Sequence, residues 1–264
     1  MGAWTITALA LGAELSPIEE ARSLHAQGAA LYQAGKFREA LPLQQRAVQL
    51  YEQALGSEHP ETIVSLNNLA EMHRALGEYA QALPVYLRAL KVREKTLGPE
   101  HPDTANSLSN LAGLYRAQGE YTQALPLYQR ALQIRERVFG PAHPVTSISL
   151  NNLASLYQFL GDHQQALPLY QRAVEIRERA LGPDHPDTAV ALNNLAGAYE
   201  SLGRYNEALP LYRRAWENLE KTLGPEHPTA IVSLNNLALL YQTPLCPQRT
   251  PSPSCRPGCG PRRH

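Results

Sequence analysis

The sequence has 264 residues, of which 44% are hydrophobic and 18% charged, and its formal net charge is +0. Four of its 24 lysines and arginines lie in segment 243–264, which has no acidic residue, so 20 basic residues face 24 acidic ones in the rest of the chain. A nucleic-acid-binding protein needs a clustered positive surface to neutralise phosphates, and this mildly acidic body does not offer one. We therefore exclude nucleic acid as a partner.

The N-terminal extension, residues 1–15, contains an apolar run from Trp4 to Leu15. The run is shorter than the about 20 residues that span a bilayer, and no lysine or arginine precedes it as in a signal peptide. The cysteines all lie in segment 243–264, so neither disulfides nor a paired CxxC zinc motif supports the body of the chain; they are Cys246, Cys255 and Cys259. These features predict a cytoplasmic protein without a membrane partner.

From residue 16 onward the chain repeats itself every 42 residues. Before each turn glycine, apolar residues at i, i+3, i+4 and i+7, as from Leu108 to Tyr115, predict an amphipathic helix, which we call helix A. After the glycine, the same spacing from Tyr121 to Leu132 predicts a longer helix B. The pattern therefore predicts hairpins of two helices. The turn glycines are Gly35, Gly77, Gly119, Gly161 and Gly203, and a His-Pro pair precedes each later helix A at His59, His101, His143, His185 and His227.

Local signals mark where these helices begin and end. Segment Ser16–Glu19 reads as a capping box with proline at the first helical position, and Gly98-Pro99 ends a helix B. We expect five hairpins and a sixth helix A over residues 16–242, followed by a disordered Pro/Arg/Cys tail over 243–264. The abrupt change after Gln242 is typical of a truncated parent or a shifted reading frame. One alanine per helix B marks its close approach to helix A, at Ala82, Ala124, Ala166 and Ala208.

The repeat resembles the tetratricopeptide repeat. The residues that carry the resemblance are Leu111, Ala112, Tyr115, Gly119, Tyr121, Ala124, Tyr128 and Ala131. The usual repeat has about 34 residues; the longer helix B, the LGPEHPDT connector and the NNLA segment are similar to the repeats of kinesin light chains and their prokaryotic relatives. The resemblance covers Glu19 to about Tyr241. It implies an all-α fold, a right-handed α-solenoid of stacked antiparallel helix hairpins, and a protein that binds other proteins.

An asparagine recurs in each later helix A, one residue before a core leucine. That offset turns it about 100° from the buried stripe, toward the concave groove in which a solenoid binds its ligands. These residues are Asn68, Asn110, Asn152, Asn194 and Asn236. The resemblance implies that they hold the main chain of an extended peptide; the alternative is that each bonds to a neighbouring helix. The preceding residues Asn67, Asn151, Asn193 and Asn235, with Ser109 in one copy, are also expected to face the groove.

A second position of helix A varies in charge between the repeats and is expected to set specificity. It holds Arg74, Arg116, Gln158, Glu200 and Gln242. Kinesin light chains are known for binding acidic, tryptophan-containing peptides. Arg74 and Arg116 agree with such a preference, whereas Glu200 argues against it. The alternative is that these are ordinary solvated side chains.

No pattern in the sequence indicates catalysis, a cofactor or a metal. The repeated histidines are expected to cap helices, because equivalent residues of stacked hairpins lie on the order of 10 Å apart and zinc needs nitrogens at about 2 Å. There is no phosphate-binding glycine loop and no nucleophile motif. We therefore expect no enzyme and neither cofactor nor metal.

Three functions agree with the sequence. The first is a protein-interaction scaffold that binds an extended peptide in its groove. The second is a sensor or regulatory arm of a larger signalling protein, such as an ATPase or a protease. The third is self-association through the sixth helix A, whose apolar side is expected to be exposed.

Overall fold

The computed structural model of the chain describes residues 15–242. The predicted tail with its three cysteines, and all of the predicted N-terminal extension except Leu15, lie outside the described residues. No helix within residues 15–242 is both long enough and apolar enough to span a bilayer.

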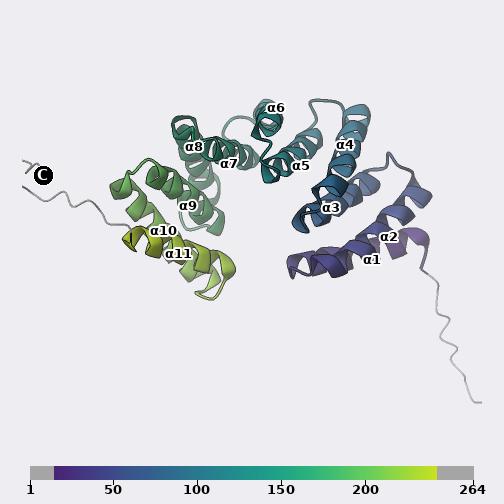
Figure 1. The fold of residues 1–264 in the computed structure, drawn as a ribbon, viewed down its shortest axis with the longest axis horizontal. Coiled ribbons are helices and arrows are strands. Elements are labelled where there is room, and N and C mark those ends of the chain that lie inside the picture. Colours follow the sequence, from purple (N-terminus) through teal and green to yellow (C-terminus); the bar gives the residue numbers. More distant parts are fainter. Residues whose placement is uncertain (1–14, 243–264) are drawn as a thin grey trace, which may run out of the picture. The chain divides into compact units, whose positions relative to one another are not determined.

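The part of the chain that is described consists of eleven α-helices and contains no strand. The A helices are α1 (Pro17–Gln33), α3 (Pro60–Ala75), α5 (Pro102–Ala117), α7 (Pro144–Phe159), α9 (Pro186–Ser201) and α11 (Pro228–Gln242). The B helices are α2 (Phe37–Leu55), α4 (Tyr79–Thr96), α6 (Tyr121–Phe139), α8 (His163–Leu181) and α10 (Tyr205–Leu223). A and B helices packed on each other, such as α5 with α6 and α9 with α10, form the predicted hairpins (Figure 1).

The chain divides into two compact units, which meet in sequence within α8. Unit 1 extends to Ile176 and unit 2 begins at Arg177. In unit 1 each helix from α1 to α6 packs on the next one, and in unit 2 α9 packs on α10 and α10 on α11. Unit 1 is therefore a run of stacked hairpins, and unit 2 contains the hairpin of α9 and α10 with α11 packed on it; each unit is described by itself.

The connector from a B helix to the next A helix satisfies its own polar groups. In the connector before α5, Gly98 adopts a φ of +97°, which a side chain would disfavour. His101 is the N-cap of α5, and its Nδ1 accepts the backbone N–H of Asp103 at 3.1 Å. The buried hydroxyl of Thr104 donates to the carbonyl of Gly98 at 2.8 Å. The predicted capping role of the histidines is confirmed here and at the four equivalent residues, His59, His143, His185 and His227.

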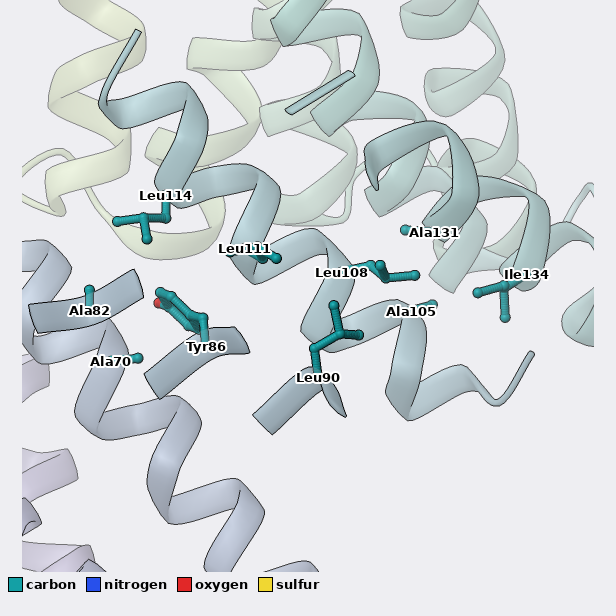
Figure 2. Packing of buried hydrophobic residues seen from close by; sticks show 10 residues of the cluster. All are labelled: Ala70, Ala82, Tyr86, Leu90, Ala105, Leu108, Leu111, Leu114, Ala131 and Ile134. Atoms are coloured by element: carbon teal, nitrogen blue, oxygen red, sulfur yellow. The ribbon is translucent and has the colours of Figure 1, made fainter. Parts of the chain in front are cut away.

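Helix α5 shows how a helix A is buried from two sides in unit 1. Figure 2 shows Leu111 and Leu114 toward Tyr86 of α4, while Leu108 lies toward Ile134 of α6. The predicted small residues of the B helices are fully buried at each position, which agrees with a close approach of helix B to helix A; they are Ala82, Ala124, Ala166 and Ala208. The apolar stripe of helix A therefore packs on both the preceding and the following helix B.

Candidate functional site

One asparagine of each later helix A lies at the edge of the buried stripe. Asn68, for example, is half-buried and directly precedes the buried Leu69. Successive residues of an α-helix are about 100° apart, so the asparagine points away from the leucine. We call the side of the A helices that carries these residues the asparagine face. Unit 1 contributes Asn68, Asn110 and Asn152 to it, and unit 2 contributes Asn194 and Asn236, all of them half-buried.

Most of these asparagine side chains have no partner in the protein. Asn68 is the exception, because its Nδ2 lies 3.3 Å from Nε2 of His25 on α1. Within residues 15–242, the other four side chains form no hydrogen bond. A primary amide offers both donors and an acceptor. The asparagine face therefore presents amide groups whose hydrogen-bonding capacity the fold leaves unused.

The preceding asparagine, which was also expected to face the groove, differs in exposure between the repeats and is turned inward in α3. Asn67 is only 7% exposed, and its Nδ2 donates to the carbonyl of Ile63 in the same helix at 2.9 Å. Ser109 makes the same bond to Ala105 in α5. The Oδ1 atoms of Asn67, Asn151 and Asn193 are buried without a partner. Asn235 is exposed. A role of Asn67, Asn151 and Asn193 in ligand binding stays a prediction.

Apolar side chains lie beside the asparagines on the same side of the helices. One turn before the asparagine, four of the five helices carry an apolar residue, namely Val64, Ile148, Val190 and Val232, of which Val64, Ile148 and Val232 are exposed, whereas α5 carries the exposed Asn106. Residues four apart are neighbours on a helix surface. The asparagine face therefore combines amide groups with small apolar surfaces, a combination that suits an extended peptide with apolar side chains.

Arg74, a predicted specificity residue, belongs to a closed polar cluster in unit 1. Its Nε donates to Glu71 Oε2 at 2.9 Å, and the hydroxyls of Tyr32 and Tyr86 donate to the same carboxylate at 3.0 and 2.6 Å. Burial opposes the charge of Glu71, but the hydrogen bonds from Arg74 and Tyr86 outweigh it and lower the Glu71 pKa. The hydrogen bond to Glu71 raises the pKa of Arg74. In this cluster the positive charge of Arg74 is therefore neutralised by the negative charge of Glu71.

Arg116 occupies the equivalent position of the next repeat without an acidic partner. Its Nη1 donates to Ser155 Oγ on α7 at 2.9 Å, and its guanidinium lies 5.6 Å from the ring centre of Phe159. Among the described residues it forms no ion pair. Gly113, which replaces Glu71 in this repeat, cannot supply a carboxylate. Of the two predicted arginines, only Arg116 thus presents an unbalanced positive charge.

Arg74 and Arg116 belong to a row of equivalent residues, one in each later helix A. The next two members of this row bind the tyrosine of their own B helix. Gln158 accepts the hydroxyl of Tyr170 at 3.2 Å, and in unit 2 Glu200 accepts that of Tyr212 at 2.8 Å. Burial and then the hydrogen bond to Glu200 raise the pKa of Tyr212. Gln242, the last residue of α11, is exposed. The row therefore changes from a positive residue in unit 1 to a negative one in unit 2.

A small cavity of about 120 Å³ adjoins Asn68 between α1 and α3. Ala29 and Tyr32 of α1 line one side, and Asn68, Glu71 and Met72 of α3 line the other. Ala29 of α1 stands at the position where α3 carries Glu71. The cavity was not predicted from the sequence, and nor was the role of Glu71. Glu71 lies three residues after Asn68, so it shares the helix surface, and the variation of this position among the repeats is the signal that could have revealed it.

The described residues include no group of three histidine, cysteine or acidic side chains placed to hold a metal. The repeated histidines use Nδ1 to accept a backbone N–H, as His101 does. The polar groups at the site can form hydrogen bonds and ion pairs with a ligand.

Solved structures of known proteins are similar to the chain in fold. Two crystal structures of TPR-like repeats from a kinesin light chain candidate of Podosopora anserina are similar to the chain. One has 29% sequence identity and a TM-score of 0.66 and covers 80% of this chain and 99% of its own. The other has 30% identity and a TM-score of 0.63, with 76% and 95% covered. BtubC (BKLC) of P. vanneervenii shares the fold at 24% identity and a TM-score of 0.63, with 80% and 90% covered. No curated protein matches the sequence.

The family model of the tetratricopeptide repeat matches the chain in overlapping segments, at residues 19–95, 64–134, 103–179, 146–221 and 195–244. Together these segments include all of the A helices from α3 onward and every B helix. The resemblance seen in the sequence is thus confirmed, and the chain belongs to the tetratricopeptide repeat family, with kinesin light chain-like repeat proteins among its structural neighbours.

Proposed function

We propose that the chain is a protein-interaction scaffold that binds the main chain of an extended peptide on the asparagine face of unit 1. The observation that carries the proposal is that Asn110 and Asn152 stand at equivalent places of neighbouring A helices and make no hydrogen bond within the described residues. The amide atoms of these two side chains are not among the buried polar atoms that lack a partner, so a ligand can reach them, and a peptide group offers them both a donor and an acceptor. Asn194 and Asn236 form a second, separate part of the face in unit 2.

The proposal also assigns different roles to the two arginines. Arg74 is balanced by Glu71, so it adds little net charge to a bound peptide. Arg116 has Ser155 as its hydrogen-bond partner and can therefore attract an acidic side chain of the ligand. An acidic residue of the peptide should then lie near α5 and α7. The predicted preference for acidic ligands is carried by Arg116 alone.

A peptide ligand selected from a random displayed library on the immobilised full chain provides the test. Its dissociation constant is measured by calorimetry for the natural chain and for Asn110→Ala/Asn152→Ala. The loss of two sets of hydrogen bonds, each contributing about 0.5–1.5 kcal/mol, should weaken binding by about tenfold or more. Asn206→Ala, an exposed asparagine on α10, is the matched control and should leave the affinity unchanged.

Methylation of single peptide nitrogens separates main-chain recognition from side-chain recognition. If the asparagines bind peptide groups, methylation at one or two positions should reproduce the loss seen in the double variant, and it should have little further effect on that variant. Equal affinity of the natural chain and the double variant would refute the assignment. For the arginines, Arg116→Gln should weaken an acidic peptide by about threefold and Arg74→Gln by less.

A further inference from the structure

The last described helix, α11, is covered on one side and exposed on the other. Leu237 and Leu240 are buried against Ala208 and Tyr212 of α10. Ile231, Leu234 and Ala238 lie together on an adjacent side of the helix and are exposed. No helix of the described chain packs on them, since α11 contacts only α9 and α10. We call these three residues the open face of α11.

In the preceding repeats, the surface that corresponds to the open face packs against the B helix that follows. Figure 2 shows Ala105 and Leu108 of α5, the counterparts of Ile231 and Leu234, toward Ala131 and Ile134 of α6. The four counterparts of Leu234 are at most 2% exposed, namely Leu66, Leu108, Leu150 and Leu192, whereas Leu234 is 43% exposed. The counterparts of Ala238, namely Ala70, Ala112, Ala154 and Ala196, are fully buried. The open face is therefore shaped to pack against an antiparallel helix.

The charge of α11 favours another copy of itself as that helix. Its sequence, PTAIVSLNNLALLYQ, contains no acidic or basic residue. A two-fold axis places equivalent residues of two copies close together, so a charged helix would repel itself at such a contact, whereas α11 would not. A two-fold axis perpendicular to the helix also makes the two copies antiparallel, which is the arrangement of helices A and B in a hairpin.

We propose that two copies of the chain associate through their open faces, with the α11 of each copy taking the place that a B helix takes in the other repeats. Leu234 lies near the middle of α11, so the axis passes close to it. The contact involves one helix from each copy and falls at the small end of specific interfaces, which makes it a reversible association with a Kd on the order of 10 µM. Asn236 lies about 200° around the helix from Leu234, so the dimer leaves the asparagine face accessible and does not depend on the peptide proposal.

Sedimentation equilibrium of the full chain from about 1 to 200 µM, which brackets that affinity, tests the proposal. The average mass should rise with concentration from that of one chain toward that of two. Leu234→Glu should weaken the association at least tenfold, because two carboxylates then meet near the axis. Leu234→Lys should do the same by itself, and an equimolar mixture of the two variants should recover association as a mixed dimer. Leu239→Glu is the matched control, because Leu239 is an exposed leucine of α11 on the side of Asn236.

The possible results separate the proposal from its alternatives. Circular dichroism confirms that each variant keeps its helices. A full chain that stays monomeric throughout would overturn the proposal; if it then dimerised after removal of residues 243–264, the following segment would be the occupant of the open face. Equal weakening by Leu239→Glu and Leu234→Glu would also overturn it, because the contact would then not be the open face.

Discussion

Helices α5 and α11 have the same sequence pattern but differ in how much of it is buried. Leu108 of α5 is 0% exposed and its counterpart Leu234 in α11 is 43% exposed, although both follow a serine and precede the asparagine segment. The difference comes from the neighbours: α5 packs on both α4 and α6, whereas α11 packs on α9 and α10 only. In a repeat protein, the contribution of a residue to stability therefore depends on the repeat that follows it.

Truncation of the equivalent leucines, Leu108 and Leu234, should give the largest difference in stability between changes in the two helices. We expect Leu108→Ala to lower the free energy of unfolding by about 2–5 kcal/mol, because it leaves a cavity in a closed core. Leu234→Ala should cost less than about 1 kcal/mol, because that side chain is partly solvated in one chain. Urea denaturation at low micromolar concentration measures both. Equal losses would mean that α11 is covered in solution under these conditions.

Enlargement of the equivalent alanines, Ala112 and Ala238, should give a smaller difference in stability. Ala112→Leu should destabilise the fold by about 1–3 kcal/mol, because the added atoms have no space between α5 and its neighbours. Ala238→Leu should leave the unfolding free energy of the single chain almost unchanged, because Ala238 is exposed. Thermal denaturation followed by circular dichroism compares them. A destabilisation by Ala238→Leu as large as that by Ala112→Leu would contradict the open face.

The connectors before the two helices differ by one hydrogen bond. Thr104 donates to Gly98 before α5, whereas Ala230 stands at the equivalent place in α11. Thr104→Ala should cost about 1 kcal/mol, because the carbonyl of Gly98 loses the shorter of its two hydrogen bonds and keeps only the one from the backbone N–H of His101. Thr104→Ser retains the hydroxyl and serves as the control in the same denaturation experiment. A Ser variant as unstable as the Ala variant would assign the effect to the methyl group rather than to the hydrogen bond.

The smallest expected effect is on the pH dependence of stability, and it comes from a difference between α5 and α1. In α1, His25 stands at the position that Ser109 occupies in α5. Burial lowers the pKa of His25 below 6.5, and Glu61 opposes this only in part. The unfolded chain then binds the proton more readily, so the stabilisation is complete above pH 6.5 and is lost as the pH falls toward the lower pKa of the folded state. His25→Gln should remove this part of the pH dependence between pH 7 and 5. An unchanged profile in the variant would show that other groups cause it.

The sequence predicts the helices well because their boundaries are set locally. A His-Pro pair starts a helix through the histidine side chain and the fixed φ of proline, and a glycine ends one through a positive φ. The exposure of Asn110 and Asn152 also follows from their offset to a core leucine. The periodicity of the sixth helix A likewise predicted that one of its apolar sides is exposed, and this side is the open face.

Other features depend on contacts that the periodicity does not reveal. Glu71 binds Tyr32, 39 residues before it, and Tyr86, 15 residues after it, and these partners come from two other helices. Asn67 and Asn68 are adjacent and chemically identical, yet one bonds to its own helix and the other approaches His25. Only the packing of neighbouring helices distinguishes them.

The connectors also affect how such a chain can change over time. The histidine cap and the bond from Thr104 to Gly98 both join residues of a single connector. A 42-residue segment that is duplicated or deleted in register brings its own connector chemistry with it, and only the packing to its two neighbours has to be renewed. The number of repeated asparagines can therefore grow or shrink in whole repeats, and under the proposed function the length of the bound peptide would evolve separately from how each repeat folds.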